Sequence, residues 1–171
     1  MNDKEKEIIP FLGIGKLTFH TEREEIFSIL GKPSVHINEL VMPRIMIYRF
    51  STQGIQIYYD LDKENFPFAI EISKQYGGQY LGKNLFGKSL EKIKFSINKT
   101  LIDRKMFDSV WEITEDSLWF NFTEKGKLFS ITVFREGYLN FISEKKACNR
   151  PTVSLSGAER EKKYGRYYRF E

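Results

Sequence analysis

The chain contains a weak internal repeat, and this feature constrains the fold more than any single motif does. Residues 15–19 (GKLTF) are echoed 67 positions later by residues 82–86 (GKNLF). Further on, the alternating apolar positions of residues 55–59 are echoed by residues 118–122, now with an offset of 63. A repeated unit indicates which residues the fold needs twice. The sequence therefore predicts two units with the same order of elements.

Each unit is predicted to begin with a short amphipathic helix. In the first unit, Thr21 and Glu24 have the spacing of a capping box, and an apolar stripe at helical spacing follows until Gly31. In the second unit, Ser89 is the expected N-cap of a helix whose apolar stripe covers residues 90–101.

After each helix the apolar period changes to two, which is typical of half-buried strands. Short loops between such runs favour antiparallel neighbours. The predicted strands lie at 48–50, 55–59 and 68–72 in the first unit, with 79–81 as a candidate fourth strand, and at 111–113, 118–122, 129–133 and 138–142 in the second.

The predicted fold class is therefore α+β, with two tandem repeats that each pack one helix on a meander of three to four antiparallel strands. The expected boundaries are 1–76 for the first helix-plus-sheet repeat and 77–143 for the second. Residues 144–171 form a basic, aromatic C-terminal tail. With 41% apolar residues in 171, the chain can bury a core without a metal or a disulfide.

The cysteine content and the N-terminal segment indicate a cytoplasmic protein without a membrane partner. The single Cys148 excludes an internal disulfide. The first residues are charged and lead into only a few apolar positions before Pro10, so we expect neither a signal peptide nor a membrane span. The net charge of +4 permits a nucleic-acid partner but does not require one.

One segment has the spacing of a phosphate-binding loop. Residues 82–89 (GKNLFGKS) match the pattern G-x-x-x-x-G-K-[ST] before a predicted helix. A working loop follows a buried parallel strand, whereas residues 75–80 are polar and rich in glycine. The glycine and phenylalanine of this loop also recur at Gly15 and Phe19, where no lysine-serine pair follows. We therefore expect these two residue types to serve the fold.

Other chemistry-bearing residues are too few for a catalytic or metal site. Residues 60–65 offer oxygen ligands but lack the glycine that a calcium loop needs at its sixth position. His20 and His36 are the only histidines, and neither has a second soft ligand near it in the sequence. We therefore expect a non-enzymatic protein with no catalytic residue, no metal and no cofactor.

The face of the sheet opposite the helices is the candidate binding surface. Large aromatic side chains and arginine among polar groups are typical of protein-binding surfaces. The alternative is that Trp119 and Phe134 are buried between the two units. Alternation places on this face Arg49, Gln56, Tyr58, Glu71, Glu112, Trp119, Asn121 and Phe134, and the tail adds the stacking and cationic residues Tyr164, Arg166, Tyr167, Tyr168 and Arg169.

Two segments carry a family resemblance. Residues 19–26 (FHTEREEI) with 30–33 (LGKP), and residues 86–93 (FGKSLEKI), resemble the helix-opening pattern of BamE-like and beta-lactamase-inhibitor-like repeats. The resemblance covers about residues 13 to 142 and implies a non-enzymatic binder. Tandem cytoplasmic members look like immunity proteins, which neutralise a bacterial toxin by masking its active surface.

The basic charge of the chain favours a toxin with an acidic face over a nuclease-type partner. The second hypothesis is a single-stranded nucleic-acid-binding protein that uses the same sheet aromatics and the Arg/Tyr tail. The sequence leaves the oligomeric state open.

Overall fold

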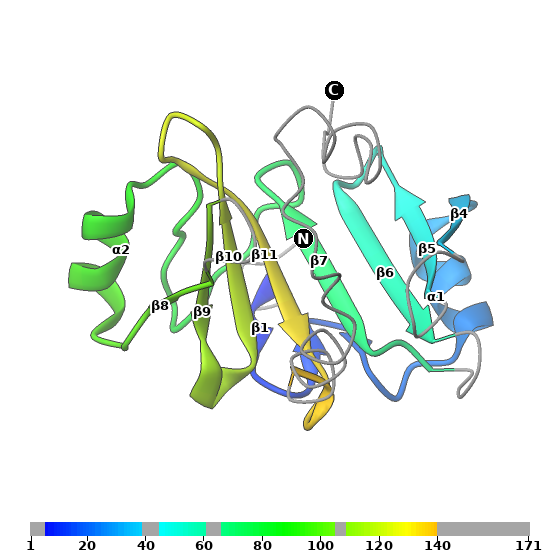
Figure 1. Cartoon of the computed structure of the whole chain (residues 1–171). Helices are drawn as coiled ribbons and strands as arrows, with labels where there is room; N and C mark the ends of the chain where they lie inside the picture. The colour runs from blue at the N-terminus through cyan, green and yellow to red at the C-terminus, as the bar shows by residue number, and fades with distance from the viewer. Residues whose placement is uncertain (1–5, 39–44, 61–65, 105–108, 140–171) are drawn as a thin grey trace, which may run out of the picture.

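The computed structural model describes residues 6–38, 45–60, 66–104 and 109–139, and its main element is an eight-stranded antiparallel sheet (Figure 1). The strands follow the order β4-β5-β6-β7-β11-β10-β9-β8, so the order is symmetrical about the β7–β11 pair. Their bounds are β4 (Ser34–Asn38), β5 (Ile45–Phe50), β6 (Ile55–Asp60), β7 (Ala69–Ser73), β8 (Ile102–Asp103), β9 (Val110–Ile113), β10 (Leu118–Phe122) and β11 (Leu128–Phe134).

The N-terminal residues form a separate sheet of three short strands, β1 (Ile8–Ile9), β2 (Gly13–Ile14) and β3 (Leu17–Thr18). Gly13 has a φ of 140°, and a Cβ atom there would lie 2.1 Å from the carbonyl oxygen of Leu17. Only glycine therefore fits this tight crossing of β2 and β3.

Two helices of eight residues, α1 (Arg23–Leu30) and α2 (Leu90–Ile97), lie toward opposite ends of the large sheet (Figure 1). Each helix buries two aliphatic side chains, Ile26 and Leu30 in α1 and Ile93 and Ile97 in α2. These side chains belong to the same core cluster as the three-stranded sheet and one face of the large sheet. Both helices therefore cover the same face.

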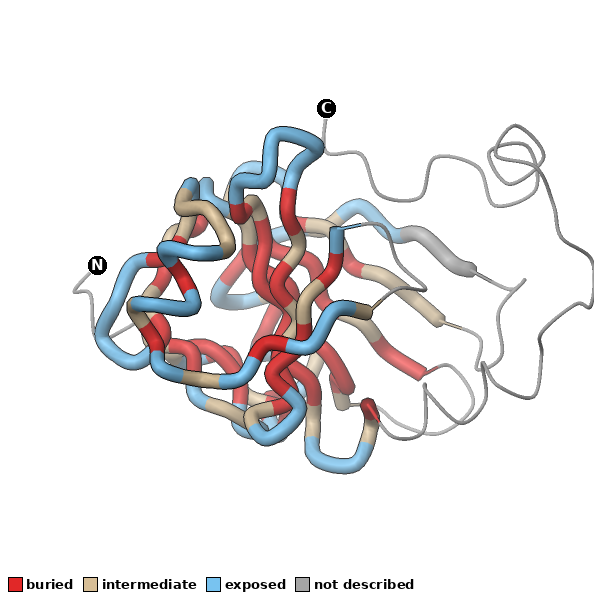
Figure 2. The backbone as a smooth tube through the Cα atoms, turned by 60° about the vertical axis from the view of Figure 1, so that its left-hand side comes forward, coloured by how far each residue is buried: buried red, intermediate tan, exposed pale blue. Residues whose placement is uncertain are grey.

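The burial pattern of the strands follows from this arrangement. Along β10, buried and half-buried residues alternate strictly, as expected for a strand with one core face. The central strands β6 and β7 are buried at nearly every position, and Figure 2 shows the buried backbone concentrated in the middle of the fold. Their second face is therefore also covered in large part.

The predicted α+β class with two helix-plus-meander repeats is wrong. Among the described residues strand predominates over helix, only two short α-helices are present, and strands from both halves join in one sheet. Ile70 and Ile72 of β7 lie opposite Val133 and Ile131 of β11. An unpaired β7 edge would leave this apolar strand and its backbone polar groups without partners, which explains why the halves merge. Alternation within a strand carries no information about such pairing.

The local predictions have a mixed outcome. The strands predicted after each helix correspond to β5, β6, β7, β9, β10 and β11, whereas β4, β8 and the three-stranded sheet are absent from the prediction. Residues 79–81 form only isolated bridges, and Tyr138 and Leu139 are helical, so no fourth strand begins at Tyr138. The capping box is also wrong, because the N-cap of α1 is Glu22 and the Thr21 hydroxyl lies 2.9 Å from the Thr18 hydroxyl.

Candidate interaction face of the sheet

A row of mainly polar side chains crosses the whole sheet on the face opposite the helices. Residues directly opposite each other in an antiparallel ladder point to the same side. The intervening positions, such as Ile57 and Phe120, belong to the core under the helices. We call this set the polar row, and the register orders it as Ser34, Arg49, Gln56, Glu71, Thr132, Trp119, Glu112 and Ile102.

The strand register also places the other predicted face residues beside the polar row. Tyr58 and Phe134 both lie opposite Ala69, and they flank the row on one side. Asn121 lies opposite Ser130 and flanks the row on the other side. All eight residues predicted for this face therefore share it, although they come from six strands of both halves.

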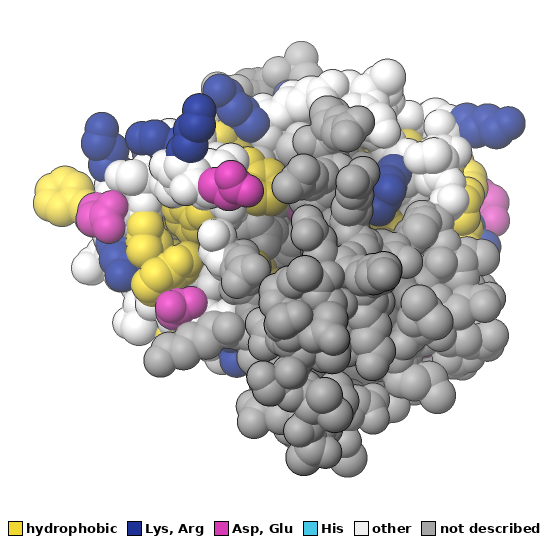
Figure 3. Space-filling view, turned by 45° about the horizontal axis from the view of Figure 1, so that its top comes forward, with side chains coloured by type: hydrophobic (Ala, Val, Ile, Leu, Met, Phe, Trp, Pro, Cys, Tyr) yellow, Lys and Arg dark blue, Asp and Glu magenta, His cyan; other side chains and the backbone are white. Residues whose placement is uncertain are grey.

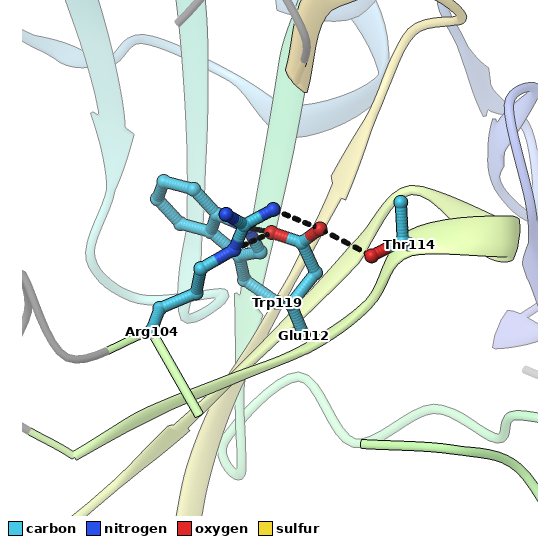
Figure 4. Close-up of polar contacts among 4 residues, drawn as sticks. All are labelled: Arg104, Glu112, Thr114 and Trp119. Carbon is cyan, nitrogen blue, oxygen red and sulfur yellow. Dashed lines mark hydrogen bonds and ion pairs between the residues drawn. The ribbon is translucent and has the colours of Figure 1, made fainter. Parts of the chain in front are cut away.

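Near one end of the polar row, the buried carboxylate of Glu112 accepts hydrogen bonds from three side chains (Figure 4). Glu112 is fully buried and accepts hydrogen bonds from Arg104 Nε at 2.5 Å, Thr114 Oγ1 at 2.7 Å and Trp119 Nε1 at 2.7 Å, and it also accepts one from Arg104 Nη2. Burial acts to raise the pKa of Glu112, but the hydrogen bonds from Arg104, Thr114 and Trp119 outweigh it and lower the pKa. Glu112 is therefore an ionised anchor for Trp119.

A second buried carboxylate occupies the middle of the row. Glu71 accepts hydrogen bonds from the Tyr58 hydroxyl at 2.5 Å and the Ser130 hydroxyl at 2.6 Å, and Asn121 donates to Ser130 at 2.9 Å. Burial raises the pKa of Glu71, and the hydrogen bonds and the charge of Arg49 offset this only in part. The two glutamates of one row therefore have opposite electrostatic environments.

The opposite pKa shifts of Glu71 and Glu112 can be tested by measuring stability as a function of pH. An acid with a raised folded-state pKa destabilises the folded state progressively as the pH rises above the unfolded value of about 4.3. The variant Glu71→Gln lacks this titration, and its amide can bond the Tyr58 and Ser130 hydroxyls. We expect its free energy of unfolding, relative to the wild type, to improve between pH 4 and pH 7 in urea titrations.

The matched control is Glu112→Gln, for which the expected change in relative stability with pH has the opposite sign. A lowered pKa stabilises the folded state above the unfolded value, and this contribution is lost as the pH falls through the folded value. The Glu112 variant should therefore become less stable relative to the wild type as the pH rises. Parallel pH profiles for the two variants would contradict the opposite environments of the two carboxylates.

Aromatic side chains cover part of the face beside the polar row. Trp119 and Phe134 pack edge to face with ring centroids 4.8 Å apart, and Phe68 stacks on Tyr138 at 4.1 Å. Phe68, Phe134 and Leu139 are buried in a second core cluster on this face. Tyr138 and Leu139, which follow β11, thus lie over this face of the sheet.

The expectation of an open face therefore needs correction. Phe134 is 4% exposed and cannot act as a binding anchor, and Glu71, Glu112 and Gln56 are also buried. Phe134 instead fits the alternative prediction, burial between the two halves, because it lies on β11 opposite Ala69 of β7. The half-buried members of the predicted set are Arg49, Tyr58, Trp119 and Asn121, and the predicted tail residues 164–169 lie outside the described residues.

Sequence reasoning missed several partners in this network. Ser130 and Thr132 occupy the polar positions between the apolar residues of β11, so the same alternation could have placed them on the face. Arg104 directly follows the short strand β8 and carries no comparable signal, because nothing in the neighbouring sequence indicates that it reaches Glu112 on β9.

The two buried carboxylates of this face lie too far apart to act as a catalytic pair of the glycosidase kind. Glu71 and Glu112 are separated by three strand spacings, or about 14 Å. Paired catalytic carboxylates lie within about 5–10 Å of each other. Within the described ranges, no group of three or more His, Cys, Asp or Glu side chains is placed to hold a metal ion.

The loop at residues 82–89 is built differently from a phosphate-binding loop. The Gly82 N–H donates to the Glu7 carboxylate at 3.1 Å, and the Phe86 N–H donates to Asn84 Oδ1 at 3.1 Å. The ammonium group of Lys83 donates to the carbonyl of Ser96 in α2. The Glu7 carboxylate thus already binds the Gly82 N–H, whereas a bound phosphate would need the backbone amides of the loop to be free.

No protein-family model matches the chain, and no match was found among the curated proteins or the solved structures. No helix in the described part of the chain has the length and apolar character needed to cross a membrane.

Proposed function

We propose that this protein is a non-enzymatic, protein-binding inhibitor of the immunity-protein kind, and that it binds its target with the face that carries the polar row. The observation that supports this proposal most is the anchoring of half-buried Trp119 by the ionised, fully buried Glu112. A tryptophan fixed in this way loses little conformational entropy on binding. Rigid aromatic side chains near arginine and amide groups are the usual hot spots of protein interfaces.

The charge of the face favours a protein partner over a nucleic acid. The network holds two carboxylates, Glu71 and Glu112, beside the two guanidinium groups of Arg49 and Arg104. Phosphate binding needs an excess of cations, because the released counterions drive it. A face with balanced charges suits a polar protein surface, and the net charge of +4 of the whole chain favours an acidic one.

The two tryptophans provide a matched pair of variants. Trp119 lies on the proposed binding face, whereas Trp111 lies opposite Phe120 on the helix-covered face. We expect Trp119→Ala to weaken partner binding by about 2 kcal/mol, or roughly 30-fold, because a central aromatic anchor is lost. Trp111→Ala should change binding by less than about 0.5 kcal/mol.

The partner can be sought by pull-down with the tagged full chain from its native host, with the product of the neighbouring gene as the first suspect. Calorimetric titration of the purified partner then compares the wild type with both variants. Equal losses for Trp119→Ala and Trp111→Ala would exclude this face as the binding surface. A steep linear fall of the logarithm of affinity with the logarithm of salt concentration, measured with single-stranded DNA, would favour the nucleic-acid hypothesis instead.

A further inference from the structure

The outward side of α2 exposes one large aromatic side chain. Phe95 is 93% exposed, more than any other large hydrophobic residue in the described ranges. It lines a shallow groove together with four polar neighbours, Lys88, Glu91, Lys92 and Ser96. Figure 3 shows hydrophobic side chains among Lys/Arg and Asp/Glu side chains at the edge of the molecule that carries α2. We call the five groove residues the α2 patch.

The fold does not require this phenylalanine. The core packing of α2 is done by Ile93 and Ile97, which are 0% and 5% exposed. Neighbouring lysines have structural contacts: Lys94 lies 4.4 Å from the ring centroid of Trp111, and Lys99 pairs with Asp116 at 3.1 Å. Phe95 instead projects from the helix and belongs to neither core cluster of the described residues.

Helix α1 shows that this surface is not a general property of the helices. Its exposed positions include Glu24, Glu25 and Ile29, so its outward side is acidic with a smaller apolar residue that is 43% exposed. The α2 patch has two lysines against one glutamate, with Phe95 beside them. The two helices therefore present opposite charges, and the basic, aromatic surface belongs to α2 alone.

We propose that the α2 patch docks an acidic segment of a partner protein that places one apolar side chain against Phe95. Lys88 and Lys92 would pair with carboxylates, while the groove would take the apolar side chain. A lipid surface fits less well, because one phenylalanine on a helix of eight residues offers little to insert, and Glu91 would repel anionic headgroups. This patch lies on the opposite side of the sheet from the polar row, so the inference does not rest on the proposed function.

A random peptide library displayed on phage tests the proposal with the immobilised full chain. Clones that bind the wild type are counter-selected on Phe95→Ser, and Ile29→Ser on α1 is the matched control. We expect Phe95-dependent clones that are rich in Asp and Glu around one aliphatic or aromatic residue. Their affinity should fall about tenfold with Phe95→Ser and with Lys92→Glu, but not with Ile29→Ser. All three positions are exposed, so the variants should melt like the wild type.

Four outcomes would overturn the proposal. The selection could give no Phe95-dependent clones, or it could give Phe95-dependent clones without acidic residues. Phe95-dependent sedimentation with phosphatidylcholine–phosphatidylserine vesicles would assign the patch to a membrane. Concentration-dependent self-association in light scattering, abolished both by Phe95→Ser and by Glu25→Lys on α1, would assign it to a second copy of the chain.

Discussion

Replacing Arg104 with alanine should lower the free energy of unfolding by about 3 kcal/mol at pH 7. Arg104 donates two hydrogen bonds to Glu112, which is 0% exposed. Without Arg104, the buried carboxylate keeps only Thr114 and Trp119 as donors, and no described cation compensates its charge. A buried charge that loses its partner costs far more than an exposed ion pair contributes. Urea titration followed by circular dichroism measures the loss.

The other arginine of the face is the matched control. Arg49 is half-buried on the same face, but its Nε donates at 3.0 Å to the neutral side chain of Gln56. Arg49 also acts on the buried Glu71 through its charge, but Glu71 keeps its hydrogen bonds from Tyr58 and Ser130 when Arg49 is removed. Arg49→Ala should therefore cost less than Arg104→Ala, about 1 kcal/mol. Equal losses for the two arginine variants would mean that Glu112 is not held as a buried ion.

A double variant separates the cost of the orphaned charge from the value of the pair. If Arg104→Met and Glu112→Leu are combined, the charge and its partner disappear together. The stability of the double variant should therefore return to within about 1 kcal/mol of the wild type, despite the hydrogen bonds that Thr114 and Trp119 lose. This recovery would show that the ion pair adds little net stability, which is compatible with a role of Glu112 in positioning Trp119.

The strands of this fold were easier to predict from the sequence than their assembly. Alternation located β5, β6, β10 and β11 because each has a core face that demands an apolar residue at every second position. The edge strands β4 and β8 need fewer apolar residues, because Val35 and Ile102 are 56% and 46% exposed. The pairing of β7 with β11 joins segments about 60 residues apart, and no local pattern encodes it.

The candidate face was predicted in part for the same reason. Alternation correctly grouped residues such as Arg49, Glu71 and Trp119 on one face, since the period of two fixes the side to which each residue points. Exposure could not be predicted, because it depends on what covers the face. Tyr138 and Leu139 were predicted to extend the sheet as a strand, and instead they lie over it with Phe68 and Phe134.

The junction between the halves gives the last prediction. Ile131 of β11 is 1% exposed and lies between Ile72 of β7 and Phe120 of β10. Truncation to alanine leaves a cavity in the centre of the shared core, so Ile131→Ala should cost about 3 kcal/mol in free energy of unfolding. Ile102→Ala in the exposed edge strand β8 removes the same atoms and should cost less than about 0.5 kcal/mol.

The same variant tests whether the halves unfold as one unit. Both tryptophans of the chain, Trp111 and Trp119, lie in β9 and β10, so their fluorescence reports on the second half, whereas far-ultraviolet circular dichroism reports on all strands. If the β7–β11 pair couples the halves, Ile131→Ala should lower both midpoints equally and keep them coincident. A fluorescence transition that moves to lower urea while part of the circular dichroism signal stays behind would show two independent units. In that case the continuous sheet would join the halves without making them cooperative.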